Sequence, residues 1–423
     1  MIDYTKQPDW PILCVDGRSF YASVEAVARG LDPRTCLLAV VSDVARPGSV
    51  VLAASPALKA KHGIKTGSRL YEVPDDPAIW VVGARMDHYL GVSTQMARIL
   101  HDYAPPEDIL VYSVDEAWVE VPPLLGDVVQ TAGHIQQRIE RELGLPTGIG
   151  IGPNMFLAKV SLDVEGKKQG VATWTYADVP VKLWKVPTKD CWGIGEALSR
   201  RLAAMGVYTL GDLAHASLAT LERRFGVIGN QLFHHAWGVD HSRPRNTYQA
   251  PPSSFSKGIT LLRDYRDRDE VGTVLLELCD AVTERARQHG LVGRTVSLSV
   301  GYSQQSWEAG GFSHSVGLPH PTCLQMEVYN TCMNLLARHD RPGNAVRQLY
   351  VALSNLVPAQ QVQSSLFSDQ ERQLKVARAM DTIRDRFGHQ AVLRGRNLAP
   401  GRTDQDGKIG GHAAGTRIGG LRP

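Results

Sequence analysis

The chain has 423 residues, of which 43% are hydrophobic and 21% are charged, a composition typical of soluble globular proteins with several domains. No apolar run approaches the ~18–20 residues that a membrane span needs. The N-terminus also lacks the layout of a signal peptide. These features predict a cytoplasmic protein and exclude a membrane partner.

The net charge of +3 is unevenly distributed. Residues 372–423 contain eleven lysines and arginines against four acidic residues, so the preceding 371 residues are acidic overall. An acidic body with a basic tail is compatible with a metal-using enzyme that contacts polyanions. A merely solvated tail explains the charge equally well.

Strands and helices alternate along the first 175 residues, which predicts an α/β or α+β core. Apolar runs predict strands at 11–17, 36–42, 50–55, 80–84 and 109–121. Helical spacing or helix-end signals predict helices at 18–30, 56–63, 86–104 and 126–144, and residues 146–164 read as strand, loop and helix. Residues 178–240 are mostly helical, and residues 257–356 have enough strands and helices for a separate small domain.

Six cysteines stand singly along the chain, without a CxxC pair or metal-finger spacing. This pattern predicts reduced, mostly structural thiols and no zinc site. Cys14 in "PILCVDG" is expected to pack within a strand and not to act as a nucleophile.

Two adjacent carboxylates, Asp115 and Glu116, interrupt the strand-forming stretch "YSVDEAWVEV". Burying an ionised carboxylate without a partner is costly. Neighbouring strand residues face opposite sides, so the pair converges only if the backbone bends at residues 114–116. Asp16 ends the first strand, and three converging carboxylates would require divalent cations, with Mg²⁺ the natural choice beside phosphates. The pair taken alone is equally compatible with an exposed turn.

The segments "CVDGRSFYASVE" and "YSVDEAW" resemble the two metal-ligand motifs of Y-family (translesion) DNA polymerases, with a closer likeness to the bacterial UmuC/UvrX branch. Three further segments, "VVLAASPALKAKHGIKTG", "GIGPNMFLAKVS" and "WGIGEALSRRLAAMG", follow in the family's order. The resemblance covers about residues 10–370. It implies an α+β multidomain fold, a right-hand polymerase with a helical thumb that contains a helix-hairpin-helix and an α/β little finger.

That fold implies the following domains: a palm at 1–28 and 85–177, fingers at 29–84, a thumb at 178–242, a linker at 243–256, a little finger at 257–356, and a tail at 357–423. The resemblance assigns Asp16, Asp115 and Glu116 as catalytic carboxylates that bind two Mg²⁺ ions. The backbone carbonyl of Gly17 matches the family's main-chain metal ligand. The implied reaction is attack of a primer 3′-hydroxyl on the α-phosphate of a dNTP.

Nucleotide contacts are implied at three further residues. Tyr21 matches the steric gate that excludes a ribose 2′-OH, and Phe20 precedes it. Lys159 in "FLAKV" matches a lysine that contacts the triphosphate.

The fingers segment departs from the family. Relatives place a tyrosine and an arginine where this chain has Ala57 and Ala60. Either a neighbouring lysine, Lys59 or Lys61, substitutes for them, or triphosphate binding is weaker.

DNA contacts are implied in the thumb and the little finger. The Gly193-Ile194-Gly195 turn of a helix-hairpin-helix would present backbone N–H groups to a phosphate, with Arg200 adding charge. A GxG sequence alone is also an ordinary turn. Lys257 is a candidate phosphate contact of the little finger, as are Arg263, Arg294 and Arg347, and each could equally be solvated surface.

The segment "QSSLF" in the tail resembles the bacterial sliding-clamp peptide Q-L-x-L-F. Gln363, Leu366 and Phe367 would be its anchors in a hydrophobic pocket of the clamp. The alternative is that Leu366 and Phe367 cap the little finger.

The sequence thus predicts a low-fidelity, template-directed DNA polymerase for translesion synthesis and DNA repair, acting on primer-template DNA and dNTPs. Further candidate partners are the sliding clamp, an accessory subunit and a recombinase filament. A catalytically weak adaptor that docks to the clamp is the alternative, and a nucleotidyl cyclase with a palm fold is a third. The intact carboxylates argue against the adaptor, and the thumb-like hairpin argues against the cyclase.

Overall fold

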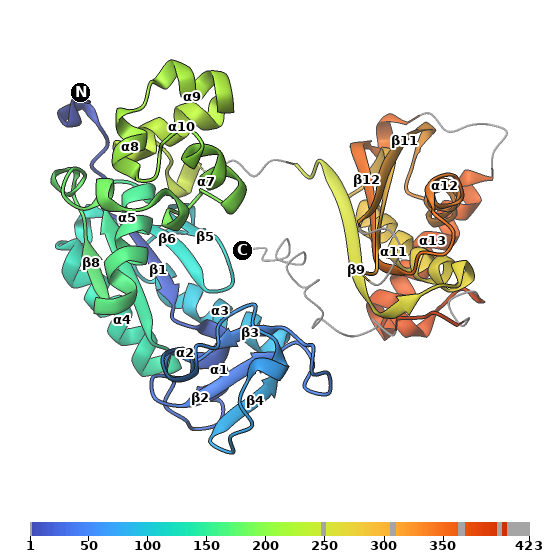
Figure 1. Ribbon diagram of the computed structural model, residues 1–423, viewed down its shortest axis with the longest axis horizontal. Coiled ribbons are helices and arrows are strands. Elements are labelled where there is room, and N and C mark those ends of the chain that lie inside the picture. The colour runs from blue at the N-terminus through green and yellow to red at the C-terminus, as the bar shows by residue number, and fades with distance from the viewer. Residues whose placement is uncertain (1, 247–250, 305–309, 363–368, 396–399, 404–423) are drawn as a thin grey trace. The chain divides into compact units, whose positions relative to one another are not determined.

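The chain folds into two compact units, Met1–Tyr248 and Gln249–Pro423 (Figure 1). The computed structural model describes residues 2–246, 251–304, 310–362, 369–395 and 400–403. The first unit has two sheets and the second has one, and each unit buries hydrophobic core residues of its own. None of the helices in these ranges is both long and apolar enough to cross a bilayer.

The central feature of the first unit is a five-stranded sheet with the order β5-β6-β1-β7-β8. The middle strand β1 runs antiparallel to both neighbours, and β8 runs parallel to β7. The strands are β1 (Ile12–Gly17), β5 (Ile109–Val111), β6 (Glu116–Glu120), β7 (Thr147–Gly152) and β8 (Val171–Thr173).

The two faces of this sheet bury different side chains because successive strand residues alternate. Leu13 and Val15 of β1 join a core formed with α1 (Phe20–Val27), α3 (Met86–His101) and α4 (Val128–Leu143). Cys14 points to the other face, which is covered by α5 (Met155–Ser161) and the π-helical turn η5 (Leu162–Gly166).

Glycines in β7 allow α5 to approach the sheet closely. A Cβ atom at Gly150 would lie 2.1 Å from the carbonyl oxygen of Ala158, and one at Gly152 would lie 2.5 Å from the nitrogen of the same residue. The "TGIGIG" strand therefore brings the polar end of α5 and η5 directly over β1. The short helix α6 (Lys167–Gln169) continues from η5.

Residues 37–83 form a separate three-stranded sheet with the order β3-β2-β4. Its elements are β2 (Leu37–Val41), β3 (Val51–Ala54), α2 (Pro56–His62) and β4 (Ile79–Gly83). The predicted helix start is confirmed, since Ser55 accepts a hydrogen bond from the N–H of Leu58 and Pro56 occupies the first turn.

The predicted helical segment after residue 178 is also confirmed. It contains α7 (Glu196–Ala203), α8 (Leu210–His215), α9 (Leu218–Phe225) and α10 (Val227–Ala236) around a core of their own.

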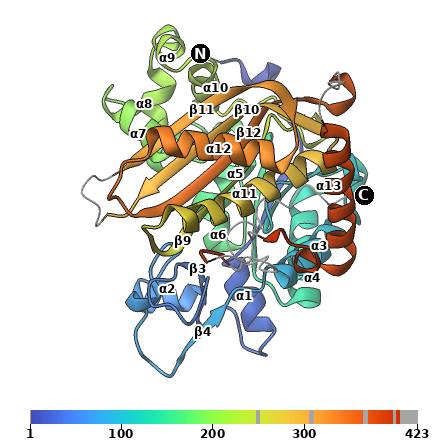
Figure 2. The ribbon, with the colours of Figure 1, turned by 90° about the vertical axis from the view of Figure 1, so that its right-hand side faces the viewer.

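The second unit is a four-stranded antiparallel sheet, β11-β10-β12-β9, with two helices packed on one face (Figure 2). Its elements are β9 (Ser254–Tyr265), α11 (Arg268–Gln288), β10 (Leu291–Tyr302), β11 (Gly311–Thr322), α12 (Gln325–His339) and β12 (Val346–Pro358).

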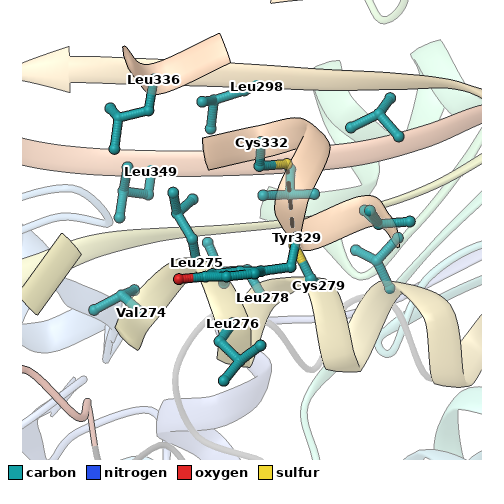
Figure 3. Close-up of a cluster of buried hydrophobic side chains, with 14 of the residues drawn as sticks. Val274, Leu275, Leu276, Leu278, Cys279, Leu298, Tyr329, Cys332, Leu336 and Leu349 are labelled. Atoms are coloured by element: carbon teal, nitrogen blue, oxygen red, sulfur yellow. Dashed lines mark hydrogen bonds between the residues drawn. The ribbon is translucent and has the colours of Figure 1, made fainter. Parts of the chain in front are cut away.

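The core of the second unit lies between these helices and the sheet, and includes Leu275, Leu298 and Leu349 (Figure 3). Within it the sulfur atoms of Cys279 and Cys332 are 4.0 Å apart. All six cysteines are free thiols, as the sequence predicts.

The predicted linker at 243–256 is too long at both ends. Arg243 pairs with Glu120, and Arg245 binds Asp108 through two hydrogen bonds of 2.6 and 2.5 Å. The residues before 247 are therefore anchored to the first unit, while β9 already begins at Ser254. Sequence composition missed these anchors because they are ion pairs with partners more than 120 residues away.

The predicted tail at 357–423 also needs correction. β12 extends to Pro358, and α13 (Gln370–Phe387) packs against α11. Arg287 binds Asp381 through hydrogen bonds of 2.6 and 2.8 Å, and Arg384 lies 2.7 Å from Asp280. Buried ion pairs hold much of this helix, so its polar composition concealed it.

Candidate active site

Asp16 and Glu116 lie directly opposite each other in the antiparallel pair of β1 and β6. Opposed residues share a face, so both carboxylates emerge beneath α5 and η5, on the side of Cys14. Asp16 is 9% exposed and Glu116 is 8% exposed. The strand register therefore brings together two acidic residues that are 100 positions apart.

Asp115 lies in a backbone bend between β5 and β6, beside the end of β1. The bend spans Ser113–Asp115 and begins one residue earlier than the sequence predicts. The N–H of Gly17 donates to the carbonyl oxygen of Asp115 at 2.8 Å, and the hydroxyl of Ser113 donates to its carboxylate at 2.7 Å. This bend keeps Asp115 beside Asp16 although Glu116 is already part of the strand.

Two lysines from the overlying helical segment neutralise the carboxylates. Lys159 Nζ lies 2.9 Å from Glu116 Oε1 and 3.2 Å from Asp163 Oδ1. Lys167 Nζ lies 3.1 Å from Asp16 Oδ2 and 2.9 Å from the same oxygen of Asp163. Sequence reasoning missed Lys167 and Asp163, although their four-residue spacing after Lys159 places all three on one helix face.

Exposure distinguishes the two lysines. The side chain of Lys159 is 5% exposed, whereas that of Lys167 is 40% exposed. A ligand that enters the site can reach Lys167 directly, and Lys159 mainly holds Glu116.

The clustered carboxylates of the site favour a bound cation. Burial raises the pKa of Asp16 to about 6; Lys167 opposes this shift, and the negative charge of Asp115 adds to it. Burial also raises the pKa of the Cys14 thiol well above its ordinary value, and this thiol donates to Glu116 Oε1 at 3.4 Å. Cys14 is therefore a packing residue, as predicted.

The donor set is the kind that Mg²⁺ prefers, since it consists of carboxylate and carbonyl oxygens without sulfur or imidazole. In the described ranges, no three acidic, histidine or cysteine side chains are already close enough to hold one metal ion. The lysine ammonium groups compensate the carboxylates instead. The residues fit a Mg²⁺ site by their chemistry and burial, and the two-ion arrangement stays a prediction.

Tyr21 is backed by a second tyrosine. The two rings of Tyr21 and Tyr89 stack with centroids 4.4 Å apart. The hydroxyl of Tyr89 donates to Glu25 at 2.8 Å, and Arg85 makes two further hydrogen bonds of 2.8 Å to this carboxylate. Phe20, in contrast, is 3% exposed and belongs to the core, so its side chain offers no surface to a nucleotide.

The two candidate fingers lysines differ in position. Lys59 Nζ donates to the hydroxyl of Ser19 at 2.8 Å, just before the start of α1. Burial lowers the pKa of Lys59, and the positive charge of Lys167 lowers it further. Both lysines are exposed on α2, and the hydrogen bond to Ser19 is what distinguishes Lys59. Because Ser19 follows Asp16 by three residues, this hydrogen bond brings Lys59 close to Asp16.

The hairpin before α7 exposes its backbone. Gly193 has φ +87°, a conformation that favours glycine, and a Cβ atom at Gly193 or Gly195 would meet no other atom within 4 Å. Arg200 is exposed and lies 3.9 Å from Glu196 on the same helix. Arg201 instead donates to a backbone carbonyl within this helical region.

The remaining predicted contacts belong to the second unit. Lys257 lies on β9 opposite Val351, and its exposure is intermediate. Gln363, Leu366 and Phe367 fall outside the described residues.

Comparison with known proteins shows which family the chain belongs to. Residues 15–163 match the sequence model of the impB/mucB/samB family, residues 252–366 match that of its C-terminal domain, and residues 189–240 match the thumb domain of DNA polymerase iota. The chain is 45% identical to UvrX of Bacillus subtilis (strain 168), a protein assigned to UV-damage repair, over 97% of this chain and 100% of that protein. The chain belongs to the Y family of DNA-directed DNA polymerases.

Other Y-family relatives align over nearly the whole length. DNA polymerase IV of Moorella thermoacetica is 37% identical over 92% of this chain and 96% of its own. The fold resembles that of a Y-family polymerase chimera of Dbh and Dpo4, with a TM-score of 0.66 over 82% of this chain and 99% of the chimera at 22% identity. The predicted right-hand polymerase fold is confirmed.

Proposed function

We propose that this Y-family enzyme performs low-fidelity translesion synthesis in DNA repair, within the cytoplasmic response to DNA damage (the SOS response). The observation that carries the proposal is the opposition of Asp16 and Glu116 across β1 and β6, with Asp115 in the adjoining bend. The name of the UvrX relative, which refers to UV-damage repair, supports the assignment to repair.

The reaction joins the primer 3′-oxygen to the α-phosphorus of the incoming dNTP and breaks the bond to the pyrophosphate leaving group. Asp16, Asp115, Glu116 and the Gly17 carbonyl would hold two Mg²⁺ ions. When bound, these ions lower the pKa of the 3′-hydroxyl and neutralise charge on the triphosphate.

The protein's own groups position the substrates. Lys167 lies 3.1 Å from Asp16 and its side chain is 40% exposed, so it would contact the phosphates of a nucleotide bound at the carboxylates. Lys159 stays on Glu116 and Asp163 and holds this carboxylate in place. The Tyr21 ring, stacked on Tyr89, would occupy the space of a ribose 2′-hydroxyl.

The substrates are primer-template DNA and dNTPs. The thumb hairpin at Gly193 and Gly195 would hold duplex phosphates through backbone N–H groups without reading sequence. The sliding clamp, bound through residues 363–367, is a further proposed partner, as are an accessory subunit and a recombinase filament.

A catalytically weak adaptor is not favoured. Docking to a clamp does not require three neighbouring carboxylates, and burying two of them, Asp16 and Glu116, is costly. The presence of these carboxylates together with Tyr21 supports an active enzyme.

Primer extension with Mg²⁺ and dNTPs tests the proposal. Asp115→Ala should reduce the rate by about a thousandfold or more, equivalent to ~4 kcal/mol of activation free energy. Asp87→Ala, at an exposed aspartate of the same unit, is the matched control and should extend normally. Absence of extension by the wild type, or equal rates for wild type and Asp115→Ala, would reject the proposal.

A further inference from the structure

Tyr112 is exposed where its sequence context predicts burial. The stretch 109–121 is rich in strand-forming apolar residues, yet the Tyr112 side chain is 53% exposed. When a residue next to an active site is exposed although its local sequence predicts burial, that residue often has a functional role.

The ring of Tyr112 is rigidly backed. It packs edge-on against Trp118, with centroids 5.0 Å apart, and against Trp192 at 6.2 Å. Trp118 is fully buried, and its indole N–H donates to the carbonyl oxygen of Met155 at 3.0 Å. The backbone N–H of Tyr112 donates to the carbonyl of Glu116 at 2.9 Å. The exposed ring is thus held in place before any ligand binds.

Tyr112 lies between two proposed nucleic-acid contacts. It precedes Asp115 by three residues, and its ring partner Trp192 directly precedes Gly193 of the thumb hairpin. A primer strand with its 3′ end at Asp115 and a phosphate on the hairpin would therefore pass the exposed edge of Tyr112.

We propose that Tyr112 is a primer-strand contact, an inference that rests on the proposed polymerase function. Its ring packs against the deoxyribose next to the primer 3′ end, and its hydroxyl donates to the adjoining phosphate. The primer bases are paired with the template, which leaves sugar and phosphate as the accessible groups. In the described part of the chain no residue accepts a hydrogen bond from this hydroxyl. A contact of this kind positions the primer terminus without reading sequence.

The test measures equilibrium binding of primer-template DNA and steady-state extension for Tyr112→Ala, Tyr112→Phe and the control Tyr71→Ala. Tyr71 is also an exposed tyrosine, at 69%, in the residue 37–83 segment. Tyr112→Ala should weaken primer-template affinity and raise its KM roughly tenfold. The KM for dNTP at saturating DNA, the affinity for template strand alone and the melting temperature should not change, and Tyr71→Ala should match the wild type.

A neutral methylphosphonate in place of the last primer phosphodiester separates the contact of the hydroxyl with the phosphate from the contact of the ring with the deoxyribose. It should weaken binding to the wild type more than to Tyr112→Phe, which has already lost the hydroxyl. Unchanged primer-template affinity in Tyr112→Ala, with or without a lower melting temperature, would overturn the inference and leave the ring as a cover for Trp118. Because binding is measured without turnover, a wild type that binds but does not extend rejects the polymerase proposal separately.

Discussion

Replacing Asp16 by asparagine should stabilise the first unit in the absence of divalent cations while abolishing DNA synthesis. Asp16 is buried, and its carboxylate pairs with Lys167 Nζ at 3.1 Å. Asparagine has nearly the same shape and no charge, so the substitution removes the cost of burying a carboxylate with little loss of packing.

The magnitude follows from the pKa. Burial raises the pKa of Asp16 from 3.8 to about 6. The folded protein therefore favours the protonated acid, so the contribution of Asp16 to stability is present below pH ~4 and is lost as the pH rises through 6. A shift of about two units corresponds to ~3 kcal/mol at pH 7.5. Lys167 loses one partner in the variant but keeps Asp163, so we expect a net gain of about 1–2 kcal/mol.

Urea unfolding monitored by tryptophan fluorescence measures this difference, because seven of the eight tryptophans precede residue 248. The comparison is made with a chelator present at pH 4 and at pH 7.5. The free energies of unfolding should agree at pH 4 and diverge at pH 7.5. Added Mg²⁺ should stabilise the wild type more than the variant.

Asp32→Asn is a control, because the pKa of Asp32 is shifted in the opposite direction to that of Asp16. A backbone hydrogen bond from Arg34 lowers the pKa of Asp32, so its neutralisation should not stabilise the protein at pH 7.5. The reasoning about Asp16 is refuted if Asp16→Asn is less stable than the wild type at pH 7.5 without cations. A difference that is the same at both pH values would refute it equally.

Three further predictions concern the substrates and the clamp. Lys59→Ala should raise the KM for dNTP about tenfold, the loss of one charge-assisted contact, while Lys61→Ala should stay within twofold; equal effects would contradict the distinction between them. Tyr21→Ala should incorporate ribonucleotides, and unchanged sugar discrimination in primer extension would rule out a gate. Alanine at both Leu366 and Phe367 should abolish clamp retention in a pulldown with normal extension of short primers, and retained binding would exclude the peptide.

Much of the fold could be predicted from local pattern. Strand β1 follows from an apolar run, helix α2 from Pro56 and Gly63 at its two ends, and the helical segment after residue 178 from helical spacing. These signals are carried by residues that are neighbours along the chain. In the second unit, the strands β10 and β12 and the presence of two helices could be predicted for the same reason, whereas β9 and β11 were missed.

Elements held by distant charges could not be predicted. The ends of the linker depend on Arg243 and Arg245, and α13 depends on Arg287 and Arg384. Each of these arginines would be an ordinary surface residue if its acidic partner lay elsewhere. Residue composition contains no information about that pairing.

The sequence by itself identified the polymerase family and named Asp16, Tyr21, Asp115 and Glu116 as candidate site residues, because motif residues keep fixed spacings within short segments. Only the tertiary structure decided which groups meet. Strand register opposes Asp16 to Glu116, and close packing of α5 on the glycines of β7 brings Lys167 to Asp16. The ring of Tyr112 likewise packs against a tryptophan 80 residues away. Local spacing specifies backbone conformation, whereas contacts between distant residues exist only after register and packing have formed.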